Sequence, residues 1–174
     1  MRLESVSLRL LEDGIVPGLS VAVVQKGELV WHRGFGVKNA QTKEPVAANT
    51  VFEAASLSKP VFAYAVLKLV DAGKFDLDTP LTKYLPGNYD VGEDARLQQI
   101  TARHVLSHTP GFPNWRRQGN PLTIHFTPGE RFSYSGEGFV YLSKVIEHVT
   151  GEKFNEFMKR MVFDPLGMAD SSYV

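Results

Sequence analysis

A serine and a lysine lie three residues apart at the start of an apolar segment with helical spacing. In "FEAASLSKPVFAYAVLKLV", residues 52–70, Ser56 and Lys59 stand just ahead of Pro60. Proline lacks an amide hydrogen and is tolerated in the first turn of a helix, so Pro60 predicts a helix that begins close to Ser56. A side chain there lies near unpaired amides and the positive end of the helix dipole, which favours developing negative charge.

These two residue types can together form an activated nucleophile. A serine hydroxyl is a weak nucleophile until a neighbouring base takes its proton. Lys59 can act as that base if burial lowers its pKa enough to leave the amine neutral. The alternative is that Ser56 caps the helix and Lys59 is solvated. A single tetrapeptide match does not decide between the two.

A third polar side chain, Tyr134, comes just before another helical segment. It lies in "ERFSYSGEGFVYL", residues 130–142. A tyrosine in such a loop can relay a proton to or from a serine hydroxyl when nearby positive charge lowers its pKa. The alternative is a core tyrosine that ties down the loop through its hydroxyl.

Other arrangements of reactive residues are less well supported. His104 and His108 have a spacing that can hold zinc, but the H-E-x-x-H pattern and a third ligand are absent, so we expect no metal. We expect His108 to bond the backbone at the end of a helix. A Ser-His-Asp hydrolase is disfavoured because the chain has no G-x-S-x-G motif. For Glu53 and Glu137 we expect solvated or capping roles.

The composition excludes several classes of function. The 174 residues include 19 Lys plus Arg and 19 Asp plus Glu, so the formal net charge of zero argues against nucleic acid and anionic membrane as main partners. The absence of cysteine excludes disulfides and thiolate metal sites. No apolar run is long enough to span a bilayer, and the N-terminus lacks a signal-peptide core. The chain as written fits the cytoplasm, and the periplasm or exterior if a leader has been removed.

The predicted elements indicate an α+β fold. An amphipathic helix over residues 3–12 precedes two β-rich runs that flank Lys26-Gly27, a hairpin signal. We therefore predict residues 1–50 to form an N-terminal helix and the first strands of a sheet. Residues 51–174 are predicted to form a helical part, with a long Gly/Pro-rich loop over residues 109–131. Because an isolated hairpin is marginally stable and no later strand pairs with it, we expect this chain to be the front portion of a longer protein.

Several segments together resemble a known family. "VPGLSVAVVQKGELVWHRGFG", "FEAASLSKP", "VLSHTPGFP", "FSYSGEGFVYL" and "FDPLGMADSS" follow the order and approximate spacing of the serine β-lactamase and D,D-peptidase superfamily, in particular the branch of class C β-lactamases, D-aminopeptidases and related esterases. The resemblance implies an antiparallel sheet with packed helices, a helical subdomain and a cleft between them. It also implies that Ser56 is the acylated nucleophile, Lys59 its activating partner and Tyr134 the tyrosine of the Y-x-N element, with no metal or organic cofactor.

The sequence departs from the family pattern at two places. The third position of Y-x-N is Gly136, so the asparagine amide that contacts substrate in the family is missing, which weakens the expectation of β-lactam hydrolysis. The late K-T-G or H-x-G strand has no counterpart before residue 174. In the family that strand supplies one oxyanion-hole amide, and losing one such donor costs on the order of 10²–10³ in rate. We therefore expect residues 1–174 alone to be a poor catalyst.

The combined interpretation is a serine hydrolase that acts through an acyl-enzyme on an ester, a D-amino-acid peptide or a β-lactam. We expect Gly136 and His108 to lie near the substrate. Phe112 and Trp115 are expected either to line a pocket for the acyl group or to pack the long loop. The alternative function is a non-catalytic module that binds a peptidoglycan-like peptide or a protein partner. The sequence does not indicate an oligomeric state.

Overall fold

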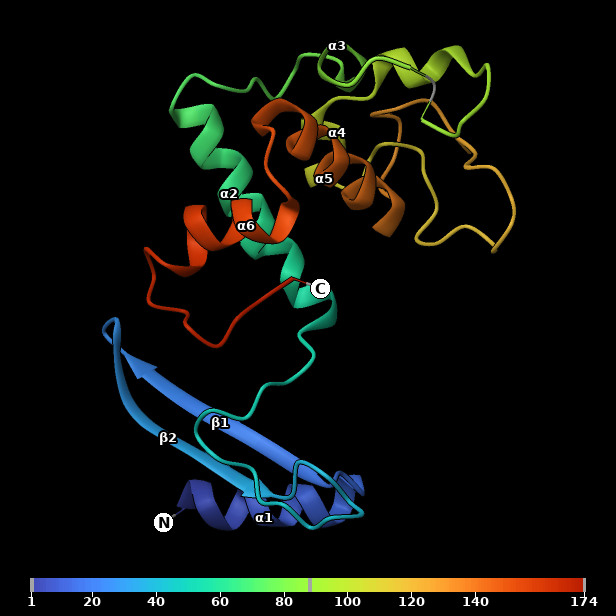
Figure 1. Cartoon of the computed structure of the whole chain (residues 1–174). Coiled ribbons are helices and arrows are strands. Elements are labelled where there is room, and N and C mark those ends of the chain that lie inside the picture. Colours follow the sequence, from blue (N-terminus) through green and yellow to red (C-terminus); the bar gives the residue numbers. More distant parts are fainter. Residues whose placement is uncertain (1, 88, 174) are drawn as a thin grey trace. The chain divides into compact units, whose positions relative to one another are not determined.

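The structure is a computed structural model that describes residues 2–87 and 89–173. It divides into two compact units, Met1–Glu53 and Ala54–Val174 (Figure 1). The fold combines a two-stranded antiparallel sheet with helices, as predicted for an α+β chain. Among the described residues, no helix is both long and apolar enough to cross a bilayer.

The first unit consists of a helix and a hairpin. Helix α1, Arg2–Gly14, packs against strands β1, Gly18–Gln25, and β2, Glu28–Gly36. The turn residues Lys26 and Gly27 both have positive φ, 52° and 83°, which is the geometry of a tight hairpin turn. An ion pair between Arg33 and Glu4 joins β2 to α1. The predicted N-terminal helix and hairpin are therefore confirmed.

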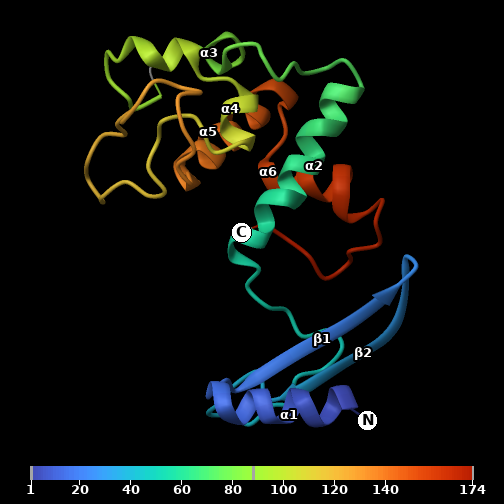
Figure 2. The same cartoon turned by 180° about the vertical axis from the view of Figure 1, so that it is seen from behind.

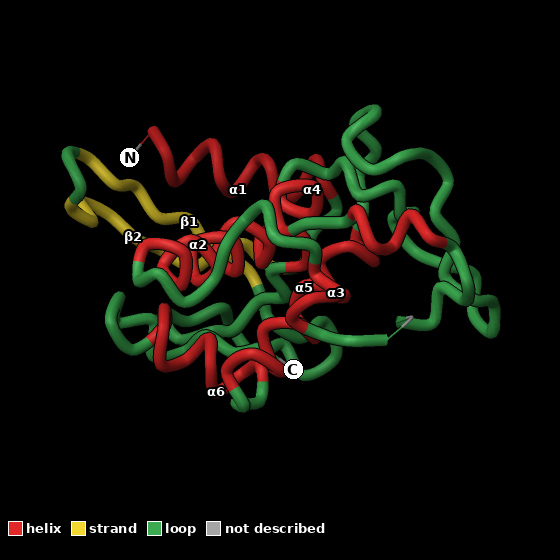
Figure 3. The backbone as a smooth tube through the Cα atoms, turned by 90° about the horizontal axis from the view of Figure 1, so that it is seen from above, coloured by secondary structure: helices red, strands yellow, loops and turns green. Residues whose placement is uncertain are grey.

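The second unit is built from helices and long loops. A 3₁₀ turn, Ala55–Leu57, leads into α2, Ser58–Asp71. Short helices α3, Leu81–Tyr84, and α4, Ala102–Leu106, follow, with a 3₁₀ turn at Ala95–Gln99 between them. Helix α5, Gly136–Thr150, precedes α6, Phe154–Met158, which continues into a π-helical turn, Lys159–Phe163 (Figure 2). Figure 3 shows both strands in the first unit and the helices of the second joined by extended loop segments.

Helix α5 lies at the centre of the core of this unit. It contacts α3, α4 and α6. The apolar side chains of α5 that are almost wholly buried are Tyr141, Leu142, Val145 and Ile146, and α2 contributes Phe62, Ala65, Val66 and Leu69. Both ends of α5 are capped: the Ser135 hydroxyl accepts from the amide of Gly138 at 2.9 Å, and Gly151 ends the helix with φ 69°. This well-anchored helix fixes the loop residues that precede it.

The long loop between α4 and α5 is tied to the core at several points. The apolar side chains that it buries are Phe112, Leu122, Ile124 and Phe126. Three backbone hydrogen bonds connect its parts: His125 N to Gly111 O at 2.8 Å, Gly129 N to Thr109 O at 2.8 Å, and Ser133 N to His108 O at 2.8 Å. A loop fixed in this way can present side chains in a defined arrangement.

Candidate active site

Ser56 lies in the 3₁₀ turn that leads directly into α2. Pro60 falls within the first turn of α2, as predicted from its missing amide hydrogen. Ala55, directly before the serine, has φ 44°, which a non-glycine residue rarely adopts. Such strain persists only where the surrounding structure holds it, and it is frequent at functional sites. The Ser56 side chain is exposed and accessible to a substrate.

Lys59 lies within reach of the serine hydroxyl. Its Nζ donates to Ser56 Oγ at 3.2 Å. The same nitrogen lies 5.0 Å from the ring centroid of Tyr134 and 5.6 Å from that of Phe139. Both distances allow cation–π attraction, which helps to hold the half-buried amine beside Ser56. The structure therefore brings the three proposed catalytic side chains together. Phe139, which the sequence did not single out, lies beside them.

The pKa of the Tyr134 phenol is lowered by its polar neighbours. Hydrogen bonding from Ser56, and then from Lys59, lowers the pKa of the Tyr134 phenol below its ordinary value. The residue is 38% exposed, so part of Tyr134 is accessible from solvent. A phenol with a lowered pKa beside a serine hydroxyl is suited to accept and return a proton.

His108 holds the tyrosine ring from the other side. Its imidazole stacks on Tyr134 with a centroid distance of 4.3 Å and an interplanar angle of 28°. Its Nδ1 accepts from the amide of Ser135 at 3.1 Å, so the neutral ring carries its proton on Nε2. The sequence predicted that His108 would bond the backbone at the end of its own helix. Instead, it accepts from the backbone amide of Ser135, the residue that caps α5. His108 also has φ 57°, a second strained non-glycine residue in this region.

The two histidines of the zinc-like spacing have separate roles. His104 forms a capping box with Thr101, whose side chain accepts from the amide of His104 while the amide of Thr101 donates to His104 Nδ1 at 3.3 Å. Across residues 2–87 and 89–173, no group of three or more His, Cys, Asp or Glu residues could hold a metal ion.

Acidification is expected to lower the free energy of unfolding, because the imidazoles of His104 and His108 bind protons less readily in the folded protein. Burial lowers the pKa of His104, and burial and then the Lys59 charge lower that of His108, from an ordinary value of 6.5. Below about pH 6.5 the unfolded chain then binds more protons than the folded one, so the free energy of unfolding rises with pH through this window. Urea unfolding between pH 5 and 7.5 should show that the free energy of unfolding rises less steeply with pH in His108→Gln than in the parent protein. Equal slopes in the two proteins would contradict this result.

Gly136 has no room for a side chain. A Cβ at this position would lie 2.6 Å from the carbonyl oxygen of Asn114 and 2.9 Å from Cη2 of Trp115. The amides of Gly136 and Glu137 both donate to that same carbonyl at 3.0 Å, so the backbone contact is fixed. An asparagine at position 136 is therefore incompatible with this conformation of the loop. Sequence reasoning missed Asn114, because no local pattern links it to α5.

Gly136→Ala is expected to lower the free energy of unfolding by about 1–3 kcal/mol, the usual cost of overpacking. The methyl group must displace backbone of Asn114 as well as the Trp115 ring. Gly138→Ala is the matched control: it lies in the same helical turn, and its Cβ would meet only side-chain atoms, at 3.1 Å. Chemical unfolding measures both changes. Equal free energies of unfolding in the two variants would show that the backbone of Asn114 can move to admit the methyl group without loss of stability.

Glu137 ties the long loop to α5, which differs from the solvated or capping role expected from the sequence. It is 6% exposed and accepts three hydrogen bonds from Arg116: from the backbone amide at 3.1 Å, from Nε at 3.1 Å and from Nη2 at 3.0 Å. Arg116 also pairs with Asp90. A buried carboxylate needs such compensation, and the pair fixes the loop beside Trp115.

A pocket of about 340 Å³ opens beside these residues. Its lining includes Lys59, Phe62, Trp115, Gly136, Phe139 and Tyr173. Trp115 is 62% exposed, whereas Phe112 is fully buried and packs edge-on against Tyr141 at 6.1 Å. Of the two aromatic residues considered for an acyl pocket, Trp115 therefore lines this pocket, and Phe112 packs the loop. Tyr173 donates to the carbonyl of Ser58 at 2.6 Å and closes one side.

Comparison with known proteins identifies the family. Residues 8–173 match the family model described as "Beta-lactamase". The chain belongs to the beta-lactamase family. It is 30% identical over 173 residues to Penicillin-binding protein 4* of Bacillus subtilis, a match that covers 87% of this chain and 37% of that protein. It is 28% identical over 201 residues to Esterase EstB of Burkholderia gladioli, covering 99% of this chain and 51% of the esterase.

Solved structures of this fold agree with the family assignment. The octameric penicillin-binding protein homologue from Pyrococcus abyssi superposes with a TM-score of 0.80 at 28% identity, over 97% of this chain and 43% of that one. The chain thus has the β-lactamase/transpeptidase-like fold and spans between about a third and a half of the length of these beta-lactamase relatives. The partial coverage is consistent with the absence of the C-terminal strands of the fold.

Proposed function

We propose that the protein is a serine hydrolase that forms an acyl-enzyme at Ser56. The observation that carries this proposal is the 3.2 Å contact between Lys59 Nζ and Ser56 Oγ, at a point where hydrogen bonding from both residues lowers the pKa of Tyr134. A nucleophile, a cation and a group able to take a proton therefore meet at one helix start. Membership of the beta-lactamase family, with an esterase among its relatives, supports a hydrolase of this type.

The proposed reaction follows from the position of each group. Ser56 Oγ attacks the carbonyl carbon of the substrate while its proton passes to the Tyr134 phenolate. The positive charge of the Lys59 ammonium stabilises that phenolate. Lys59 forms its hydrogen bond with Ser56 again at the end of the cycle. The tetrahedral oxyanion forms at the positive end of α2, where the Ser56 amide is one donor. The leaving group takes the proton from Tyr134, and water then releases the acyl group from Ser56 in the reverse sequence.

Among the substrate classes expected, we propose an ester rather than a β-lactam. Gly136 leaves no side-chain amide at the place where the family's Y-x-N element has asparagine, and Asn114 and Trp115 fill that space. A simple ester carries no amide group beside the scissile bond that needs a hydrogen-bond partner, so the loss costs an ester less than it costs a peptide or a β-lactam with an acylamino side chain. D-amino-acid peptides are intermediate, because their side chains and termini can bind elsewhere.

A substrate panel tests the proposed function. The intact protein is incubated with p-nitrophenyl butyrate, a D-alanyl-D-alanine peptide and a chromogenic cephalosporin, each beside the Ser56→Ala variant. We expect turnover of the ester that depends on Ser56, with slower or undetectable turnover of the lactam. Ester turnover that survives in Ser56→Ala would contradict the proposal, and no turnover of any substrate would favour a binding module.

A further inference from the structure

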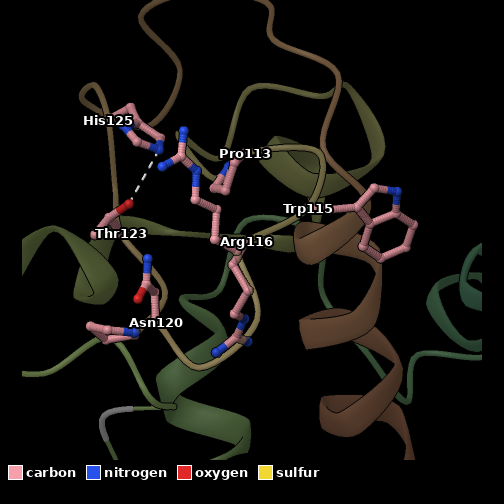
Figure 4. Close-up of a pocket in the computed structure, with 8 residues that line it drawn as sticks. Pro113, Trp115, Arg116, Asn120, Thr123 and His125 are labelled. Carbon is pink, nitrogen blue, oxygen red and sulfur yellow. Dashed lines mark hydrogen bonds between the residues drawn. The ribbon is translucent and has the colours of Figure 1, made fainter.

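A second depression lies on the same loop, on the other side of Trp115. Its volume is about 470 Å³, and its lining includes Trp115, Arg116, Arg117, Asn120, Thr123 and His125. Figure 4 shows Trp115 beside a helix at one side of this depression and Thr123, His125 and Asn120 at the other. Trp115 also lines the pocket that contains Lys59. The indole is therefore a wall shared by the two hollows.

The walls of this depression are held in place by the core. Leu122 and Ile124 are buried, and Thr123 and His125 alternate with them on the exposed side of an extended segment. The Arg96 side chain donates to the carbonyl of Ile124 at 2.7 Å, which fixes the segment from behind. The side chains of Thr123 and His125 also contact each other, with Oγ1 and Nε2 3.2 Å apart (Figure 4). The wall formed by Thr123 and His125 is thus preorganised.

The polar groups of the depression favour an anion. No acidic residue lines it. The charge of Arg116 is balanced by Glu137 and Asp90, neither of which lines the depression. Arg117, in contrast, makes no side-chain hydrogen bond or ion pair with any other residue that the structure describes. Its position is set by a turn in which Asn120 N donates to Arg117 O at 3.0 Å. One uncompensated guanidinium therefore lies beside an amide, a hydroxyl and an imidazole.

We propose that this depression binds a carboxylate carried by the substrate at the end remote from the scissile bond, with Arg117 as the pairing cation. The inference rests on the proposed serine hydrolase function for the position of the scissile bond at Ser56. A guanidinium forms paired hydrogen bonds with the two oxygens of a carboxylate, and the Asn120 amide can donate as well. One unbalanced positive charge matches the single charge of a carboxylate better than the double charge of a phosphate monoester.

The shared wall explains how one molecule can reach both hollows. An acyl chain bound to Ser56 would pass along the exposed face of Trp115, which offers a flat apolar surface, and end near Arg117. Gly136 is part of this arrangement, because a Cβ there would lie 2.9 Å from the tip of the indole ring and displace it. The preferred acyl donors are therefore esters of dicarboxylic acids or of peptides with a free acidic end.

Binding can be tested without relying on turnover. Residues 1–174 contain two tryptophans, Trp31 and Trp115. Their indole ¹⁵N–¹H signals, assigned with the Trp31→Phe and Trp115→Phe variants, are followed while the intact protein is titrated with monomethyl adipate or with the uncharged dimethyl adipate. We expect the monoester to shift the Trp115 signal and to leave Trp31 unchanged, with an affinity about fivefold above that of the diester, the range of an exposed ion pair. Arg117→Gln should remove the difference, and Arg131→Gln, an exposed arginine of the same loop that lines neither hollow, should retain it.

The corresponding kinetic comparison links the depression to catalysis. The kcat/KM of mono-p-nitrophenyl adipate should exceed that of its methyl ester about fivefold at low salt, and the ratio should fall as salt screens the pair. Equal affinities of the charged and neutral adipates in the titration would overturn the proposed carboxylate site. So would a preference for the charged adipate that is lost as fully in Arg131→Gln as in Arg117→Gln. Selective binding without any hydrolysis would leave the site standing and contradict the proposed function instead.

Discussion

Replacing Ser56 with alanine is expected to lower kcat for an activated ester by about 10⁴-fold or more, the usual cost of removing a catalytic nucleophile. The change removes the hydroxyl that we propose forms the acyl bond, and it leaves Lys59 and Tyr134 in place. Since Ser56 is exposed, the free energy of unfolding should change by less than about 0.5 kcal/mol. Steady-state kinetics and chemical unfolding of the same preparation measure the two effects separately.

The control for this variant is Ser20→Ala, which removes another exposed hydroxyl, on β1. It should keep the activity of the parent protein. A Ser56→Ala protein that keeps more than about a hundredth of the parent kcat would place the nucleophile elsewhere, because binding and oxyanion contacts alone account for the residual rate of such variants.

Tyr134→Phe is expected to lower kcat by about 10²–10⁴-fold with a smaller change in KM, the range for losing a general acid–base group. Phenylalanine keeps the ring that stacks on His108 and lies 5.0 Å from Lys59 Nζ, so only the hydroxyl is lost. Because hydrogen bonding lowers the pKa of Tyr134, the phenolate form is populated at lower pH than for a free tyrosine. In the parent protein kcat should therefore rise with pH through a midpoint below 10, and this limb should be absent from the variant.

Tyr64→Phe provides the matched control, because Tyr64 is an exposed tyrosine of α2 that lines neither hollow. Its pH profile should follow that of the parent protein. If Tyr134→Phe retains the full rate and the alkaline limb, the proton of Ser56 must pass to another group, and Lys59 alone would be the base.

Much of the local structure follows from short-range rules. Pro60 sets the start of α2 because a residue without an amide hydrogen fits only the first turn, and Lys26-Gly27 sets the hairpin because both residues accept positive φ. Thr101 caps α4 by accepting from the amide of His104, three residues further along the chain. Each of these features depends on residues only a few positions apart, so the sequence alone indicates it.

The supports of the candidate site depend on long-range contacts that no spacing reveals. The stacking of His108 on Tyr134 and the pairing of Arg116 with Glu137 both join the long loop to residues at or just before the start of α5. Glu137 was expected to be solvated or capping, because a lone glutamate at a helix start usually is. Its burial follows from the path of a loop whose conformation is set by buried apolar residues, such as Leu122, and not by a periodic pattern.

Gly136, which stands in place of the asparagine of Y-x-N, has a role in the structure that the motif alone does not indicate. From the sequence, glycine there indicates only the loss of an amide. In the structure, glycine is required, because the carbonyl of Asn114 and the indole of Trp115 occupy the space of any side chain. The same contact places Trp115 between the Lys59 pocket and the depression around Arg117. In the proposed hydrolase, the loop would select the acyl group, and the start of α2 would carry the chemistry.

The most direct test of acyl-enzyme formation is the mass of the intact protein after treatment with a fluorophosphonate, followed by peptide mapping of the adduct. We expect a single adduct on the peptide that contains Ser56, formed more slowly in Tyr134→Phe and absent from Ser56→Ala. An adduct on another residue, or no adduct under conditions that label a reference serine esterase completely, would contradict the assignment of Ser56 as the nucleophile.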